Sequence, residues 1–372
     1  MDFIDLKSQQ NQIRDKIENR IQLVLDHGKY IMGPEVSELE EKLAAYVNVK
    51  YCITCSSGTD ALLLLLMAKD IGPGDAVLTT PFTYIATAEV ISLLGAEPIF
   101  VDIYPETFNM DPSGIQDAIQ YAFTKGLMPK AIIPVDLFGL PARYRLITEI
   151  AQENNLFILE DAAQGFGGSI RSKKSGSFGH AGATSFFPAK PFGCYGDGGA
   201  VFTNDEELAS IIRSIRVHGS GSDKYDNIRV GINGRLDTIQ AAILLEKFEI
   251  FEKELELRNN IASYYNENLN SNFRTPYTPK DYFSSWAQYS LLADSDLARQ
   301  KAISSLRDCG IPSMIYYRIP LHLQKVFQNL GYNKGDFPIS EKVSDYIFSL
   351  PMHPYISTDQ QNQILEVLNH VL

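Results

Sequence analysis

Short apolar segments alternate with helical segments through the first 160 residues of this chain, and no other feature limits the fold as strongly. The expected strands lie at 51–55, 76–79, 98–102, 131–135 and 156–159. Each of the first four is followed by a segment whose apolar residues have helical spacing. Apolar strands of four or five residues joined by helices predict a mostly parallel sheet covered by helices on both faces.

Two domains are expected, because 372 residues exceed the usual size of one. Residues 1–248 are predicted to form a large α/β domain that begins with a helix. Residues 249–372 are predicted to form a smaller α+β domain. One helix is expected over 235–256 and another after Arg258 to about residue 269, and a strand is expected near 313–316.

Composition excludes several classes of protein. The formal net charge of −12 argues against a broad basic face for nucleic acid, and no apolar run reaches the roughly 18 residues that a membrane span requires. The start of the chain lacks the pattern of a signal peptide. Cys52 and Cys55 form the only C-x-x-C pair, so two buried thiols are favoured over a metal site. A reduced, cytoplasmic protein is therefore expected.

Lys190 stands among apolar residues and prolines in the segment 185–200, and a glycine-rich loop follows it at once. No acidic residue lies within six positions of this lysine. A poorly solvated lysine has a lowered pKa, and its free amine forms a Schiff base with an aldehyde. A surface lysine before a glycine-rich turn fits this segment equally well.

Polar residues gather where other strands are expected to end, the position at which open α/β sheets bind ligands. The run Ser57-Gly58-Thr59 follows the first strand and opens a helix, so it is either a phosphate cradle or a simple helix cap. Asp161 and Gln164 follow the strand at 156–159, and Asp161 could instead cap a helix or form an ion pair. A lysine, a carboxylate, a phosphate cradle and aromatic Tyr84 are together the parts that a pyridoxal-phosphate enzyme needs.

At this point the chain resembles the DegT/StrS type of nucleotide-sugar aminotransferases, which have the fold-type I architecture. The resemblance covers essentially the whole chain and is densest at 58–61, 81–84, 160–164, 185–199 and 231–237. The last of these looks like the G-x-N-x-R motif of the family. The resemblance implies a mostly parallel, seven-stranded type of sheet in the large domain.

The resemblance also implies the role of each site residue. Lys190 is the Schiff-base lysine and proton shuttle, Asp161 pairs with the pyridine nitrogen, Gln164 lies near the phenolic oxygen, and Tyr84 stacks on the ring. The cofactor phosphate is implied to bind Gly58, Thr59 and Ser185, together with Asn233 of a neighbouring subunit in a homodimer. Arg235 is implied to lie near the sugar.

The implied reaction moves an amino group from L-glutamate, through an internal aldimine and pyridoxamine phosphate, to a nucleotide-linked keto-sugar. By the phrases at 3–7, 185–188 and 228–233, the chain looks most like enzymes that act on UDP-linked 2-acetamido-2-deoxy-3-keto-glucuronic acid, for surface polysaccharide and O-antigen sugars. The alternatives are a 3-keto-6-deoxy sugar linked to dTDP or UDP, or a 4-keto sugar. Dehydratases on this scaffold carry histidine at the position of Lys190, and a phosphate-binding protein without Schiff-base chemistry is the remaining alternative.

The chain departs from the family at Tyr316-Tyr317-Arg318, where relatives often carry His-Tyr-Pro close to the sugar. Arg318 could pair with a sugar carboxylate or with a diphosphate, or it could be a surface charge. All three interpretations remain open from the sequence.

Overall fold

The computed structural model describes residues 1–223 and 225–371. Its centre is a seven-stranded sheet in the order β1-β9-β8-β5-β4-β2-β3. The strands are β1 (Tyr51–Cys55), β2 (Asp75–Thr79), β3 (Glu97–Phe100), β4 (Met128–Ile132), β5 (Phe157–Asp161), β8 (Ala181–Ser185) and β9 (Gly199–Thr203). Strands β3, β2, β4, β5 and β8 pair in parallel, and only β9 is antiparallel to its neighbours. The prediction of a mostly parallel α/β sheet is confirmed.

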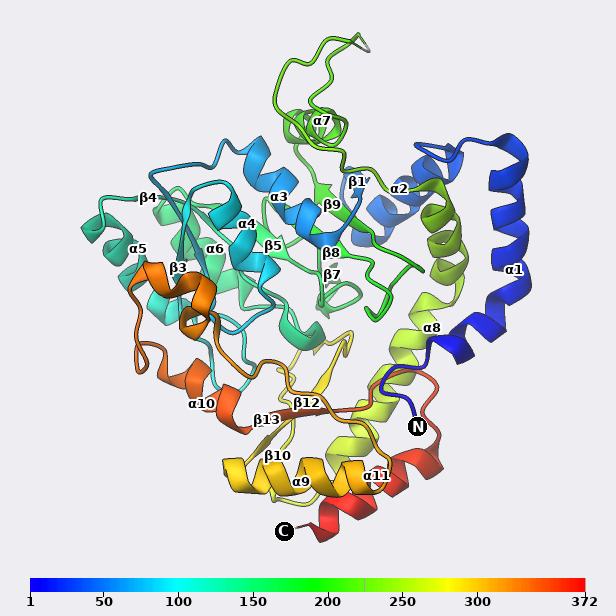
Figure 1. Cartoon of the computed structure of the whole chain (residues 1–372), viewed down its shortest axis with the longest axis vertical. Coiled ribbons are helices and arrows are strands. Elements are labelled where there is room, and N and C mark those ends of the chain that lie inside the picture. The colour runs from blue at the N-terminus through cyan, green and yellow to red at the C-terminus, as the bar shows by residue number, and fades with distance from the viewer. Residues whose placement is uncertain (224, 372) are drawn as a thin grey trace.

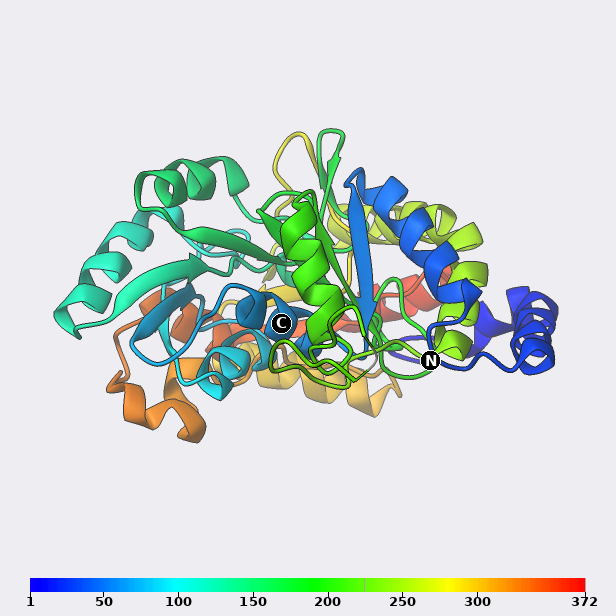
Figure 2. The same ribbon diagram turned by 90° about the horizontal axis from the view of Figure 1, so that it is seen from above.

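Helices cover both faces of this sheet (Figures 1 and 2). They are α3 (Gly58–Ala68), α4 (Ala86–Leu93), α5 (Ile115–Thr124), α6 (Tyr144–Glu153) and α7 (Glu206–Ile215). Leu65 of α3, Ile91 of α4 and Ile212 of α7 pack on one face, whereas Ile119 of α5 and Ile147 of α6 pack on the other. Because both faces are covered, β2 and β9 are buried along their whole length, and β1 is buried at all but its first residue.

The backbone register brings the ends of β1 and β8 to one level, and β5 ends two residues before β8 at the same edge of the sheet. Strand β9 pairs Gly199 with Cys55 at the end of β1 and with Ser185 at the end of β8. Strand β5 runs parallel to β8 and ends at Asp161. Since β1, β8 and β5 all point the same way, the loops that leave them begin at the same edge of the sheet.

Two N-terminal helices, α1 (Leu6–His27) and α2 (Pro34–Val47), pack against the long helix α8 (Thr238–Asn268). The prediction of two helices here is wrong, because α8 runs unbroken for 31 residues. No glycine or proline interrupts it, and Arg258 is buried within it and donates to the carbonyls of Trp286 and Met352. The predicted domain boundary at 248/249 falls inside this helix and stays a prediction.

The C-terminal region is a smaller α+β unit. Its antiparallel sheet has the order β10-β12-β13, and its helices pack around it. The elements are β10 (Phe273–Arg274), β12 (Tyr289–Ala293), β13 (Ile347–Leu350), α9 (Asp296–Asp308), α10 (Pro338–Tyr346) and α11 (Thr358–His370). The strand predicted near 313–316 is wrong: only Met314 pairs there, through two backbone bonds with Ser349 of β13.

A small three-stranded sheet and several 3-10 helices complete the structure. They are β6 (Ser169–Ile170), β7 (Lys173–Lys174), β11 (Tyr282–Phe283), η1 (Pro112–Gly114), η2 (Leu137–Gly139), η3 (Leu321–Leu323) and η4 (Lys325–Leu330). Cys52 and Cys55 are free, buried thiols in β1. In the part of the chain that the structure describes, no helix combines the length and apolar character that crossing a bilayer takes.

The continuity of α8 is testable at Glu256, an exposed residue beside the predicted break. Glu256→Pro removes a helix hydrogen bond and clashes with the preceding turn, so it should lower the free energy of unfolding by about 3 kcal/mol. Urea denaturation measures this change. Glu256→Ala loses the same side chain and should stay within about 0.5 kcal/mol of the wild type. Equal stability of the two variants would mean that the helix is interrupted there.

Candidate active site

Lys190 lies on the loop between β8 and β9 and is held by a backbone bond from its own N–H to the carbonyl of Phe187 at 2.9 Å. Desolvation lowers the pKa of its ammonium group to about 8, although the nearby charge of Asp161 opposes that shift. An amine with this pKa is partly neutral near physiological pH and is therefore a competent nucleophile.

Asp161 ends β5 and is 4% exposed. Its Oδ2 atom accepts a hydrogen bond from Thr87 Oγ1 at 2.8 Å, and Oδ1 accepts from the backbone N–H of Ala163 at 3.1 Å. Burial raises the pKa of the Asp161 carboxyl, while these two hydrogen bonds and the charge of Lys190 counteract the rise. The carboxylate is thus prepared to face a cation in a poorly solvated site.

Thr87, which donates to Asp161, is a site residue that the sequence did not predict. It lies in the first turn of α4, which follows β2, and it also contacts Thr83 Oγ1 at 3.2 Å. The sequence shows only that Thr87 is three positions after Tyr84 in a helical segment. Its contact with Asp161 depends on how α4 packs beside the end of β5, which local spacing does not encode.

The N-terminus of α3 meets the end of β8. Ser57 caps the helix by accepting a hydrogen bond from the backbone N–H of Asp60 at 3.0 Å. A Cβ atom on Gly58 would lie 2.6 Å from the Cβ of Ser185, so no larger residue fits there. The first-turn N–H groups of α3 lie next to the Ser185 hydroxyl, where they could bind a phosphate. Ser57 can therefore cap the helix while the same helix start serves as a phosphate cradle. Thr59 follows on the same turn and is half-buried.

Gln164 and Tyr317 join the two halves of the molecule at the site. Gln164 Nε2 donates to the Tyr317 hydroxyl at 3.0 Å, and Gln164 Oε1 accepts from the backbone N–H of Phe138 at 2.9 Å. Burial raises the pKa of Tyr317, and the charges of Asp161, Tyr316 and Tyr84 add to that shift. Tyr84 itself is 58% exposed at the mouth of the site.

Asn233 and Arg235 are not part of this cluster within one chain. The loop that carries them touches the end of β1, where the backbone N–H of Ser56 donates to the carbonyl of Gly234 at 3.0 Å. Asn233 is exposed and Arg235 is half-buried. In the described part of the chain, neither side chain forms a hydrogen bond or an ion pair with Lys190 or Asp161.

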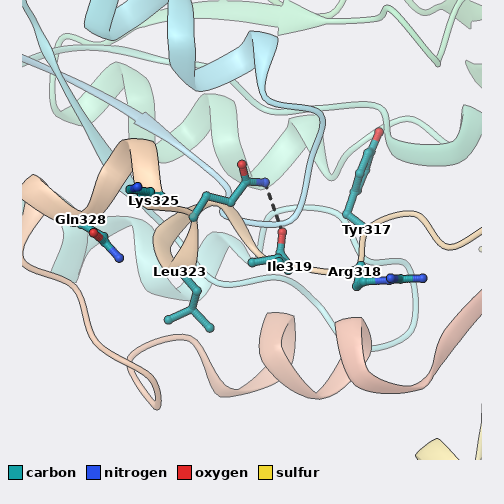
Figure 3. A pocket seen from close by; sticks show the side chains of 7 residues that line it. Tyr317, Arg318, Ile319, Leu323, Lys325 and Gln328 are labelled. Carbon is teal, nitrogen blue, oxygen red and sulfur yellow. Dashed lines mark hydrogen bonds between the residues drawn. The ribbon is translucent and has the colours of Figure 1, made fainter.

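Beyond Tyr317 an open groove of about 570 Å³ leads away from the cluster (Figure 3). It is lined by Tyr317, Arg318, Ile319, Leu323, Gln324, Lys325 and Gln328. Two of these residues are cationic and none is acidic, although the whole protein carries a net charge of −12. In Figure 3 the ring of Tyr317 points away from the groove-lining residues of η3 and η4. Tyr317 therefore lines the groove and also contacts Gln164 through its hydroxyl.

The residues of the cluster fit pyridoxal 5′-phosphate. Lys190 offers a desolvated amine for an aldehyde, and buried Asp161 offers a carboxylate for a cationic ring nitrogen. The notch at Gly58 and Ser185 leaves backbone N–H groups and a hydroxyl for a phosphate. When bound, this cofactor supplies an aldehyde that takes up amines and a ring that accepts electrons.

Comparisons with known proteins cover almost the full length of the chain. The model of the DegT/DnrJ/EryC1/StrS aminotransferase family matches residues 11–369. The UDP-2-acetamido-2-deoxy-3-oxo-D-glucuronate aminotransferase of Pseudomonas aeruginosa is 48% identical over 359 residues, which are 96% of this chain and 96% of that protein.

Solved structures agree with this result. The crystal structure of a DegT DnrJ EryC1 StrS aminotransferase from Brucella abortus has a TM-score of 0.95 and 51% identity, over 99% of this chain and 98% of that one. The structure of NtdA from Bacillus subtilis with bound cofactor PMP has a TM-score of 0.90 and 30% identity, over 99% and 83% of the two chains. The similarity therefore includes the large sheet and the C-terminal region alike.

The electrostatic link between Lys190 and Asp161 is testable in the cofactor-free protein. Asp161→Asn removes a negative charge that favours the ammonium form, so the pKa of Lys190 should fall below about 8. Competitive acetylation at a series of pH values, followed by mass spectrometry of the Lys190 peptide, measures this pKa. Asp197→Asn, which removes an exposed carboxylate on the same loop that does not act on Lys190, should leave Lys190 near its wild-type pKa. An unchanged Lys190 pKa in Asp161→Asn would contradict the link.

Proposed function

Since the chain belongs to the DegT/DnrJ/EryC1/StrS aminotransferase family, we propose that it moves an amino group from L-glutamate to the 3-keto carbon of UDP-2-acetamido-2-deoxy-3-keto-glucuronic acid. The chain is a pyridoxal-phosphate-dependent sugar aminotransferase, and the proposal concerns its two substrates. The observation that carries it is a desolvated lysine facing a buried carboxylate at the edge of the sheet. The 48% identity to a protein named for this sugar supports the choice of acceptor.

In this proposal Lys190 binds the cofactor covalently and afterwards carries the proton between substrate and cofactor carbons. Its lowered pKa of about 8 suits both tasks, because the amine must be neutral to attack and must then hold a proton reversibly. Asp161 pairs with the ring nitrogen, and Thr87 fixes the carboxylate. Gln164, held between Phe138 and Tyr317, lies beside the ring, and Tyr84 covers it.

The phosphate of the cofactor is assigned to the start of α3 and the end of β8. Gly58, Thr59 and Ser185 supply N–H and hydroxyl donors there. The helix dipole adds to this attraction for an anion.

We also propose a homodimer in which each site is completed by its partner. Figure 1 shows that the segment between α7 and α8 projects from the body of the molecule. Ile228 and Val230 on this segment are 56% and 83% exposed, which is unusual for apolar side chains that have no partner surface. Asn233 and Arg235 follow on the same segment, so an equivalent chain docked against it would receive both residues.

Acceptor selectivity is assigned to the segment at Tyr316, Tyr317 and Arg318. Arg318 lies at the mouth of a groove without acidic residues, next to the Tyr317 that contacts Gln164. A guanidinium in this place suits an anionic part of the acceptor, either a uronate carboxylate or the diphosphate. We further propose a role in surface polysaccharide and O-antigen sugar synthesis and a cytoplasmic location, which the four free cysteines support.

The first experiment records the absorbance spectrum of the protein with pyridoxal phosphate before and after L-glutamate. We expect a band of lysine-bound cofactor in the wild type, its loss on adding L-glutamate, and its return on adding the 3-keto uronic acid. Lys190→Ala should lack the band from the start. A band that L-glutamate leaves unchanged would refute the choice of donor. Return of the band only with 6-deoxy or 4-keto sugars would refute the choice of acceptor.

The role of Arg318 is tested by Arg318→Ala. The loss of one charge-assisted contact at an exposed site should raise the KM for the uronic acid substrate by roughly 10-fold, with little change in kcat. Bleaching by L-glutamate should not change. Arg145→Ala, which removes an arginine whose side chain is 84% exposed on α6, is the matched control. If KM rises equally for a UDP-linked keto sugar without a carboxylate, Arg318 contacts the diphosphate instead of the uronate.

A further inference from the structure

A second buried lysine lies directly behind the loop that carries Lys190. Lys247 belongs to α8, is 2% exposed, and donates a hydrogen bond through Nζ to the carbonyl of Gly193. Gly193 follows Lys190 by three positions in the same loop. The function proposed above gives Lys247 no role.

The loop is closed on itself around this contact. The backbone N–H of Cys194 donates to the carbonyl of Phe186 at 2.8 Å, and that of Lys190 donates to the carbonyl of Phe187 at 2.9 Å. A Cβ atom on Gly193 would lie 2.4 Å from the carbonyl oxygen of Phe187. The Gly193 peptide therefore packs directly against the turn from which Lys190 extends, and a shift of one would move the other.

Helix α8 holds this loop at three points. Gln240 Oε1 accepts a hydrogen bond from the backbone N–H of Tyr195 at 2.9 Å, and the ring of Phe251 packs on Phe192 with centroids 4.9 Å apart. Lys247 lies between Gln240 and Phe251 along the helix, and it is the only one of these three side chains that can carry a charge. Of the two hydrogen bonds among these contacts, the one from Lys247 is nearer to Lys190 in the chain.

The surroundings of Lys247 disfavour the charged form of its ammonium group. Among the residues that the structure describes, no carboxylate lies within 4.0 Å of its Nζ, which faces the ring of Tyr195 at 4.5 Å. Burial lowers the pKa of Lys247 to about 8, opposed by Glu254 and by the thiol of Cys194. Burial in turn raises the pKa of Cys194 to about 11 and of Tyr195 to about 12, so both are neutral near pH 7.

The remaining charged neighbour, Glu254, is engaged elsewhere. It accepts hydrogen bonds from Gln9 Nε2 at 2.8 and 2.9 Å and from the Tyr355 hydroxyl. Leucine or methionine would fill the Lys247 position without the desolvation cost of a buried ammonium. What lysine adds at this position is a hydrogen bond that fixes the Gly193 carbonyl.

We propose that Lys247 is a positioning residue, whose ammonium group clamps the Gly193 carbonyl and thereby fixes the loop that presents Lys190 to Asp161. This inference rests on the proposed function of Lys190 as the cofactor-binding residue. Lys247 itself touches neither substrate nor cofactor in this assignment.

The test uses the cofactor-free protein, so it does not depend on whether the substrates are correctly identified. Lys247→Met keeps the length and apolar stem of the side chain but removes the clamp, whereas Lys247→Gln keeps a hydrogen-bond donor. Hydrogen exchange of the 186–198 backbone should rise by about 10-fold in Lys247→Met and less in Lys247→Gln. The pKa of Lys190, measured by competitive acetylation, should move from about 8 toward its ordinary value as the loosened loop admits water.

Lys174→Met is the matched control. Lys174 also contacts an aromatic face, that of Tyr46 at 3.5 Å, and pairs with Glu252 of α8 at 2.6 Å, but it does not touch the Lys190 loop. It should change neither loop exchange nor the Lys190 pKa. If Lys247→Met lowers stability to urea while the loop exchange and the Lys190 pKa stay as in the wild type, Lys247 is merely structural and the proposal is overturned. Failure of the L-glutamate experiment with these two observables shifted as expected would refute the proposed function alone.

Discussion

The backbone hydrogen bonds that hold the ends of β1, β8 and β5 at one edge of the sheet are the constraint on which the site depends. Gly199 of β9 pairs with the last residues of both β1 and β8, so the start of α3 and Ser185 meet at a notch too narrow for any side chain at position 58. The parallel pairing of β5 with β8 then sets Asp161 beside that notch. Cooperative bonds between strands thus fix distances between residues more than a hundred positions apart, without any direct bond between their side chains.

Desolvation gives the residues at this edge their chemistry. Lys190 and Asp161 are both shifted toward their neutral forms by burial, and each opposes part of the shift of the other. The hydrogen bonds from Thr87 and Ala163 counteract part of the rise in the Asp161 pKa that burial causes. The proposed roles of Asp161 and Lys190, a carboxylate for a cationic ring nitrogen and a neutral amine, require such a balance between burial and neighbouring charge.

The sequence predicted the parts of the site that strands deliver. Asp161 and Ser185 end strands and Gly58 lies just after one, and the period and length of the strands suffice to predict that such residues lie at one edge. Lys190 was recognisable because its neighbours are apolar. Thr87, Phe138 and Lys247 were not predictable, since their contacts arise from the packing of a helix or loop onto a distant segment. The errors at Arg258 and at 313–316 have the same origin: tertiary packing buries an arginine inside a continuous helix, and a single bridge replaces a strand.

Helix α8 gives a physical reason why the Lys190 loop and the C-terminal region are parts of one site. Its first half anchors the loop through Gln240 and Lys247, and its second half holds the C-terminal region through Arg258, which donates to the carbonyls of Trp286 and Met352. A continuous helix transmits displacement along its axis because its own hydrogen bonds resist stretching. The C-terminal region also delivers Tyr317 to Gln164. The segment assigned to acceptor selectivity and the lysine assigned to cofactor binding therefore both belong to regions that α8 holds. We infer that this helix helps to set the distance between them.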